Sequence, residues 1–229
     1  MHLSIVLPCH NEAAALPTFI PRLKAVKTQL EAMGHTCEII VVDDGSSDSS
    51  PSLLQNESDI KLIRLNSCKG YGAALKTGFR AASGEVLAFM DCDNTYFPED
   101  LPILYAELIN SNADIVMGYR PFFGSGMPLL RAMGNALFVG LARVLFNQKI
   151  RDCSTGFRLF KRSLLPHVLN LPTCGFNFSM QLTLFCLVSS HCWRQVAIRY
   201  NHRLGDSKLS VLRDGIQYLY LMLKYRWQN

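Results

Sequence analysis

Residues 86–93 read Val-Leu-Ala-Phe-Met-Asp-Cys-Asp, an apolar run that ends in two carboxylates separated by one residue. A short, uninterrupted apolar run is typical of a strand that is buried on both faces. Two carboxylates at positions i and i+2 of an extended chain can turn toward one cation, and Mg²⁺ and Mn²⁺ prefer such oxygen ligands. Asp91 and Asp93 are therefore candidate metal ligands, with the oxygens of a diphosphate completing the coordination shell.

Short apolar strands alternate with amphipathic helical patterns around this run. Strands are predicted at 3–7, 38–42, 60–65, 85–90 and 114–118, and helices at 18–33, 47–57, 71–82 and 99–111. Alternation at this spacing predicts an α/β fold, in which helices cover both faces of a mostly parallel sheet. Ligands of such sheets bind beyond the carboxyl ends of the strands. This rule favours a metal site at Asp91 and Asp93 over a solvated turn.

Polar residues also follow the other predicted strands. The first strand leads into 8–12 (Pro-Cys-His-Asn-Glu), the second into 43–46 (Asp-Asp-Gly-Ser), and the fifth into Tyr119 and Arg120. Asp43 is the first polar residue after its strand and is placed to reach a base or ribose, whereas Asp44 or Ser46 could cap the next helix. The chain contains no Gly-x-Gly-x-x-Gly after the first strand and no P-loop motif, which speaks against those two classes of nucleotide site.

Composition indicates a globular protein with one sizeable domain. The chain has 229 residues, of which 49% are apolar and 18% charged. Its net charge of +5 would suit phosphate-bearing substrates or an anionic membrane, but it is too small to decide between them. The eight cysteines show no zinc-like spacing, so we expect buried, reduced thiols of a cytosolic protein.

Residues 164–193 contain no Asp, Glu, Lys or Arg, which invites a transmembrane interpretation. Proline, glycine and amide side chains interrupt the stretch, so a broken pair of buried helices is predicted and no spanning segment is expected. Two other apolar stretches, 128–146 and 211–227, carry cations and could lie on a bilayer surface. The alternative is that both pack on the core of the domain. Any attachment to a membrane is then peripheral or supplied by a partner.

Four motifs of the first half resemble the inverting GT-A-fold glycosyltransferases. They are Ile-Val-Leu-Pro-x-x-Asn-Glu at 5–12, Val-Asp-Asp-Gly-Ser at 42–46, the segment 66–74 with Lys-Gly-x-Gly-x-Ala, and Asp-x-Asp at 91–93. The resemblance implies that Asp91 and Asp93 hold a metal bridging the donor diphosphate. It also implies a nucleotide site made of Pro8, Asn11, Glu12, Asp43, Lys69 and Asp91.

Motifs of the second half look like those of dolichol-phosphate mannose synthase and related polyprenyl-phosphate sugar synthases. They lie at 118–120, 152–160 and 203–210. The resemblance implies that Arg120, Arg203 and Lys208 engage phosphate and form the catalytic set together with Asp93. Thr95 stands where this family often has Gln, and Gln181 lies near a position that is often Glu. These departures leave the sugar and the details of the acceptor open.

The sequence therefore predicts a GT-A catalytic domain over 1–210 and a C-terminal amphipathic helix over 211–229 that touches a membrane surface. We expect transfer of a hexose from a UDP- or GDP-sugar to a polyprenyl phosphate, with Mg²⁺ or Mn²⁺ and with inversion. A phosphate monoester is already anionic at neutral pH, so this acceptor needs no general base.

We further expect a peripheral location on the cytoplasmic face of a membrane, a membrane subunit as a potential partner, and no binding of nucleic acid. Two alternatives remain. One keeps the donor but uses the hydroxyl of a saccharide or small molecule as acceptor. The other is an inactive nucleotide-sugar-binding subunit, against which the presence of Asp91, Asp93, Arg120 and Lys208 argues.

Overall fold

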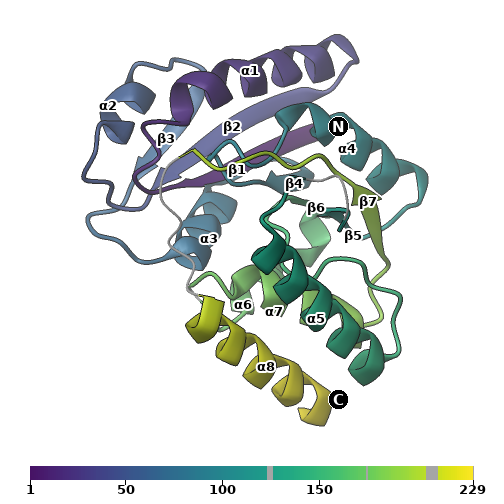
Figure 1. Ribbon diagram of the computed structural model, residues 1–229. Helices are drawn as coiled ribbons and strands as arrows, with labels where there is room; N and C mark the ends of the chain where they lie inside the picture. Colours follow the sequence, from purple (N-terminus) through teal and green to yellow (C-terminus); the bar gives the residue numbers. More distant parts are fainter. Residues whose placement is uncertain (123–125, 174, 205–210, 229) are drawn as a thin grey trace.

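A seven-stranded sheet organises the chain, in the order β3-β2-β1-β4-β6-β5-β7 (Figure 1). The structure is a computed structural model that describes residues 1–122, 126–173, 175–204 and 211–228. All neighbouring strands pair in parallel except β6, which runs antiparallel to β4 and β5. The strands are β1 His2–Cys9, β2 Thr36–Asp43, β3 Ile60–Arg64, β4 Val86–Phe89, β5 Ile115–Tyr119, β6 Arg158–Lys161 and β7 Trp193–Ala197.

Helices cover both faces of this sheet, as the alternating pattern predicts. The helices are α1 Leu16–Ala32, α2 Ser50–Gln55, α3 Tyr71–Ala81, α4 Leu101–Asn110, α5 Leu129–Phe146, α6 Leu165–Asn170, α7 Phe178–Val188 and α8 Val211–Gln228. One apolar core lies between the sheet and α1 with α4, and a second lies between the sheet and α3, α6 and α7. The predicted α/β fold class is therefore confirmed.

Helix α7 is buried on all sides and joins two cores. Phe178, Leu182 and Cys186 pack toward the sheet, while Met180 and Leu184 pack toward α5 and α8. A helix that is apolar around its whole circumference is stable in water only when neighbours cover every face. Helices α6 and α7 are the broken pair predicted for 164–193, and α5 and α8 form a further layer beyond them (Figure 1). The prediction that both helices are buried holds for α7 but is wrong for α6, which buries Val168 and exposes Pro166, His167 and Asn170.

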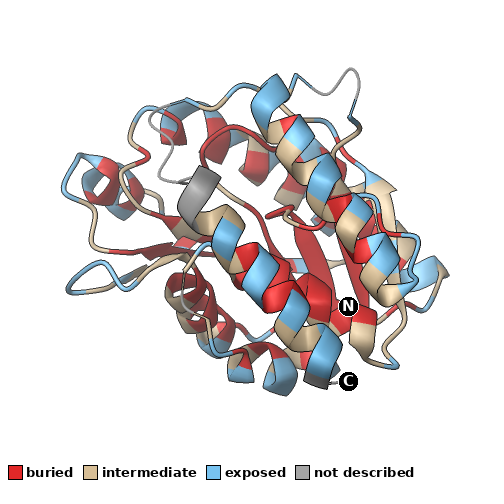
Figure 2. Cartoon of the chain, turned by 60° about the horizontal axis from the view of Figure 1, so that its bottom comes forward, coloured by how far each residue is buried: buried red, intermediate tan, exposed pale blue. Residues whose placement is uncertain are grey.

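Helices α5 and α8 lie on the same side of the molecule, and both have exposed positions along their length (Figure 2). Many of these exposed positions hold large apolar residues. We call this surface the α5/α8 face. Its members are Leu129, Leu130, Met133, Leu137, Val144, Ile216, Leu219, Tyr220, Leu223 and Trp227. The opposite side of each helix is anchored in the core, through Val139 and Ala142 of α5 and through Tyr218 and Met222 of α8.

The sequence analysis expected no spanning segment, but α5 meets the length and hydropathy criteria for one. Among the described residues it is the one helix to do so, with a mean hydropathy of 1.5 over 18 residues, of which 17% are buried. A core or surface helix can pass the same test. Arg143 of α5 donates its Nε–H to the carbonyl of Ile150 in the following loop, 2.7 Å away, which ties the helix to the domain.

Candidate active site

Two adjoining cavities lie beyond the carboxyl ends of the strands. Because β1 and β4 pair in parallel with Val6 opposite Phe89, the residues after both strands emerge side by side. The first, the β1–β4 cavity, is lined by residues that include Pro8, Glu12, Asp44, Gly70, Asp91 and Asp93. The second, the α5–α8 cavity, is lined by residues that include Asp93, Arg120, Arg131, Asn135, Ser154, Phe138, Asp214 and Tyr218.

Asp91 lies at the junction of these cavities, where its side chain is half-buried and its Oδ1 is covered. Burial and then the charge of Asp93 raise the pKa of Asp91 from its ordinary 3.8 to about 7. Its Oδ1 has no hydrogen-bond partner that meets normal geometry within the described residues. A β-carbon at Gly156 would stand 2.8 Å from Asp91 Oδ2 and 3.0 Å from the Tyr71 hydroxyl, so this position has no room for a side chain.

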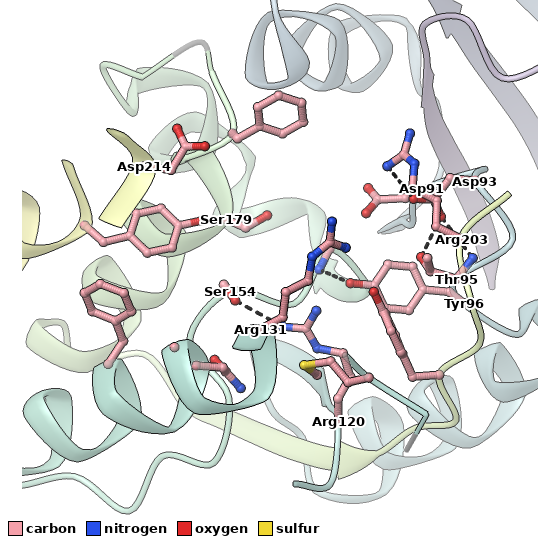
Figure 3. A pocket seen from close by; sticks show the side chains of 18 of the residues that line it. Asp91, Asp93, Thr95, Tyr96, Arg120, Arg131, Ser154, Ser179, Arg203 and Asp214 are labelled. Carbon is pink, nitrogen blue, oxygen red and sulfur yellow. Dashed lines mark hydrogen bonds and ion pairs between the residues drawn. The ribbon is translucent and has the colours of Figure 1, made fainter. Parts of the chain in front are cut away.

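Asp93 is held from both sides. Its Oδ1 accepts hydrogen bonds from the backbone N–H of Thr95 at 3.0 Å and from the Thr95 hydroxyl at 2.5 Å. Its Oδ2 pairs with Arg203 Nη1 at 2.8 Å, and the other terminal nitrogen of Arg203 pairs with Glu12. The Arg203 guanidinium thus stands between two carboxylates of the β1–β4 cavity (Figure 3 shows its contact with Asp93).

The carboxylates fit a divalent cation that takes part of its coordination from a ligand. Asp91 Oδ1 is covered and has no hydrogen-bond partner in the described part of the chain, and Asp93 Oδ2 faces the Arg203 guanidinium. No group of three or more His, Cys, Asp or Glu side chains suited to a metal occurs in the described part of the chain. Mg²⁺ is commonly bound through one or two carboxylates together with substrate phosphates. Asp91 and Asp93 match that arrangement.

The residues expected at the nucleotide separate into two groups. Pro8 and Glu12 line the β1–β4 cavity, whereas Asn11, Asp43 and Lys69 are not among its lining residues. Asn11 instead accepts hydrogen bonds from the backbone N–H groups of Ser47 and Asp48, which joins the loops after β1 and β2. These contacts give Asn11 a structural role in this loop.

Asp43 and Asp44 differ in their contacts. The Asp43 carboxylate accepts the Ser46 N–H at 3.0 Å and pairs with Arg64 at 3.3 Å, and its place at the nucleotide stays a prediction. Asp44 lines the cavity and accepts the backbone N–H groups of Lys69 and Gly70 at 2.6 and 2.8 Å. The sequence analysis offered Asp44 or Ser46 as the cap of α2, but the N-cap residue is Ser49 and no side chain caps the helix. Asp44 fixes the segment before α3 instead.

Arg120 lines the α5–α8 cavity and is strongly bound on one edge. Its Nε and Nη2 pair with the two oxygens of Asp152 at 2.7 and 3.0 Å, and Nη2 also contacts the Ser154 hydroxyl (Figure 3). Burial alone would lower the pKa of Arg120, but the charge of Asp152 outweighs it and raises the pKa above its ordinary value. The guanidinium therefore remains charged in a site with little water.

Arg131 is a cation of this cavity that the sequence analysis named only as part of an apolar stretch. It projects from the first turn of α5 into the cavity (Figure 3). Within the described residues its guanidinium forms no ion pair and no side-chain hydrogen bond. Its place in an apolar run, three residues after a proline, was the available signal. Lys208, the remaining predicted catalytic residue, lies outside the described residues.

Residues 4–169 match the family described as Glycosyl transferase family 2. A low-salt glycan biosynthesis hexosyltransferase of Haloferax volcanii is 28% identical over 96% of this chain and 53% of its own length. A dolichyl-phosphate hexose transferase of the same organism is 29% identical over 93% and 89%. An undecaprenyl-phosphate 4-deoxy-4-formamido-L-arabinose transferase of Salmonella paratyphi B is 38% identical over 92% and 63%. The chain thus spans about half of the first relative and under two thirds of the third.

A solved structure has the same fold. It is glucosyl-3-phosphoglycerate synthase from Mycobacterium tuberculosis in complex with Mn²⁺, UDP and phosphoglyceric acid. The match has a TM-score of 0.75 and covers 98% of this chain and 78% of that one, with 21% sequence identity. This likeness supports the GT-A, Rossmann-like arrangement of the sheet.

Proposed function

The chain belongs to glycosyl transferase family 2, and from that premise we propose that it transfers a hexose from a nucleotide-diphosphate sugar to a polyprenyl phosphate. Two of its relatives are named for transfer to dolichyl or undecaprenyl phosphate, and one of them matches over 89% of its length. The structure supports the proposal because an acidic cavity adjoins a second cavity that contains Arg120 and Arg131 and reaches an apolar surface.

The β1–β4 cavity is the proposed donor site. Pro8, Glu12 and Asp44 line the side on which the nucleoside would bind, and Asp91 and Asp93 would hold Mg²⁺ or Mn²⁺. Such a cation would neutralise the charge that develops on the departing nucleoside diphosphate. Arg203 would contribute to the same end once its guanidinium leaves Asp93 for the diphosphate.

The main structural evidence for a phosphate acceptor is the position of Arg131. Its guanidinium has no acidic partner within the described residues, in a cavity whose wall includes Leu130 of the exposed α5/α8 face. A phosphate that enters from that face would meet Arg131 first, with Arg120 behind it. Leu130, Phe138 and Tyr218 supply apolar wall for the first carbons of a lipid chain. Leu130 is also 65% exposed, so the cavity reaches the apolar surface.

The chemistry then requires no base from the protein. An oxygen of the acceptor phosphate forms a bond to the anomeric carbon while the bond from that carbon to the donor β-phosphate oxygen breaks. The bonding electrons leave with the nucleoside diphosphate. One displacement of this kind inverts the anomeric centre, and catalysis consists of positioning and electrostatic stabilisation.

The proposed location follows from the α5/α8 face. Apolar and aromatic side chains with nearby cations suit a helix pair that lies in the headgroup layer of a membrane. Polyprenyl-phosphate acceptors and nucleotide sugars meet at the cytoplasmic face, so we place the protein there as a peripheral enzyme. A membrane subunit could occupy the same face.

Asp214 of α8 gives the hydroxyl-acceptor alternative a specific basis. It is the carboxylate that α8 contributes to the α5–α8 cavity, opposite Asp93 in Figure 3. A hydroxyl acceptor would need such a group as general base, whereas a phosphate would not. Replacement Asp214→Asn should therefore leave transfer to a lipid phosphate largely intact and abolish transfer to an alcohol.

The test is sugar transfer by the purified protein, with UDP- and GDP-hexoses, Mg²⁺ or Mn²⁺, and either polyprenyl phosphate or a soluble glycoside as acceptor. We expect product with the lipid phosphate, loss of at least a thousandfold in Asp93→Ala, and no product in EDTA. Arg131→Ala should raise KM for the lipid phosphate while the affinity for nucleotide is kept. Full activity in EDTA would remove the metal from the proposal, and product with the glycoside alone would remove the lipid phosphate.

A further inference from the structure

Five residues line both the β1–β4 cavity and the α5–α8 cavity: Tyr71, Asp91, Asp93, Phe176 and Arg203. The hexose in transfer must lie at this junction, because its anomeric carbon exchanges an oxygen on the donor side for one on the acceptor side. Three of the five are charged and already have places in the donor chemistry. The other two, Tyr71 and Phe176, are aromatic and have none.

The two aromatic rings form a stacked pair. Their centroids are 5.7 Å apart and their planes differ by 26°. Tyr71 is half-buried, with its hydroxyl covered beside Asp91 and Gly156, whereas Phe176 is 37% exposed. Phe176 therefore presents ring surface to the junction, with Tyr71 supporting it from behind. An exposed aromatic ring inside a cavity is commonly the contact surface for a ligand.

The turn that carries Phe176 is fixed on both sides. The Phe178 N–H donates to the carbonyl of Gly175 at 3.1 Å, and the side-chain amide of Asn177 donates to Gln217 of α8 at 3.2 Å. These contacts hold the ring at the junction of the two cavities. A preset ring loses little conformational entropy when a ligand covers it.

We propose that Phe176, supported by Tyr71, is the platform on which the apolar face of the transferred hexose rests. A pyranose carries most of its C–H groups on its two faces, and these pack against the π-surface of an aromatic ring through dispersion and the ring quadrupole. The charged residues of the junction would then contact phosphates and sugar hydroxyls from the other side. The inference rests on the proposed function, since it requires a nucleotide-sugar donor.

The experiment compares the affinity of the sugar-bearing donor with that of the bare nucleotide. Calorimetry in Mn²⁺ measures Kd for UDP-glucose, GDP-mannose, UDP and GDP with the wild-type protein and with Phe176→Ala, Phe176→Leu and Phe176→Tyr. In Phe176→Ala, the affinity for the preferred nucleotide sugar should fall about tenfold while that for its nucleoside diphosphate stays within twofold. Phe176→Tyr should resemble the wild type, and Phe176→Leu should lie between the two. Leu130→Ala, which lines the α5–α8 cavity alone, should change neither affinity.

Thermal melting confirms that each variant is folded. A parallel loss of affinity for sugar nucleotide and nucleoside diphosphate would overturn the platform, because the ring would then contact the nucleotide or merely support the fold. Unchanged affinities in Phe176→Ala would overturn it as well. Wild-type protein that binds none of the four compounds would defeat the proposed function itself, a result distinct from both.

Discussion

The Arg203 side chain occupies the space that Asp93 would need for a cation. Its guanidinium pairs with Asp93 at 2.8 Å and also with Glu12, so two carboxylates of the proposed donor site are neutralised by the protein itself. A divalent cation can bind Asp93 fully only when that ion pair opens. The incoming diphosphate offers Arg203 a replacement partner of the same charge. Metal and nucleotide should therefore bind together much better than metal alone.

Replacement of Arg203 should separate its competition with the metal for Asp93 from its stabilisation of the leaving diphosphate. We expect Arg203→Ala to bind Mn²⁺ about tenfold more tightly than the wild type when nucleotide is absent, because no guanidinium competes for Asp93. Sugar transfer should nevertheless fall, since a cation that stabilises the leaving diphosphate is gone. Electron paramagnetic resonance of free Mn²⁺ measures the affinity, and Arg131→Ala, whose side chain does not contact Asp93, serves as the control. Equal Mn²⁺ affinity in Arg203→Ala and the wild type would mean that the ion pair does not oppose metal binding.

The elements of the first half could be predicted because their apolar residues recur with clear periods, and β1 to β5 all appear where the sequence placed them. Strand β6 could not, since it has four residues and begins with Arg158. That arginine is fully buried and donates to the carbonyls of Cys153 and Thr155, which no local pattern reveals. The position of Phe176 at the junction of the two cavities likewise depends on long-range contacts, so no local sequence pattern predicts it.

One carboxylate joins three elements at the amino end of the sheet. Glu38 of β2 accepts hydrogen bonds from Ser4 of β1 at 2.5 Å and from the hydroxyl and backbone of Ser83, just before β4. Burial acts to raise the pKa of Glu38, but these hydrogen bonds outweigh it and lower the pKa from 4.5 to about 2. The ionised carboxylate therefore stabilises this edge of the sheet.

The stability of Glu38→Gln should differ from that of the wild type in a pH-dependent way. Because the pKa of Glu38 is lower in the folded state, the carboxylate contributes fully to the free energy of unfolding above about pH 4.5. This contribution disappears as the pH falls toward 2. With a discount for partial exposure, we expect a loss of about 1 kcal/mol in the free energy of unfolding at pH 7. Urea unfolding from pH 7 to pH 3 measures it. The control is Glu31→Gln, which replaces an exposed carboxylate of α1 and should lose less stability at pH 7. If the stability difference between Glu38→Gln and the wild type grew as the pH fell, this account would be contradicted.

At the scale of the whole molecule, ten of the large apolar side chains with high exposure gather on one surface, the α5/α8 face. A water-soluble protein rarely leaves so many together unless a membrane or another protein covers them. The α5–α8 cavity opens on the same side, with Leu130 as a member of both. The α5–α8 cavity and the α5/α8 face therefore lie on the same side of the molecule.

Removal of apolar surface from this face should weaken binding to vesicles. We expect the double variant Leu219→Gln with Leu223→Gln to lower the partition coefficient onto vesicles of mixed neutral and anionic phospholipids by at least about tenfold. Nucleotide affinity should be kept. The matched control is Ile103→Gln with Ile109→Gln, two exposed residues of α4 on another surface of the domain. Equal vesicle binding by both double variants would indicate that a protein partner, such as a membrane subunit, covers the face instead.

The opening of the α5–α8 cavity beside that apolar face decides how far a lipid acceptor has to travel. Withdrawal of a hydrocarbon chain into water costs about 0.8 kcal/mol for each CH₂ group, so extraction of a whole polyprenyl chain would cost tens of kcal/mol. No binding site could compensate for such a loss, because the free energy of non-covalent binding rarely exceeds about 20 kcal/mol. Leu130 is exposed and lines the same cavity as Arg131, so in the proposed reaction the phosphate would reach the cations while its tail stays in the bilayer. A peripheral enzyme of the proposed kind would therefore act on its acceptor without removing it from the membrane.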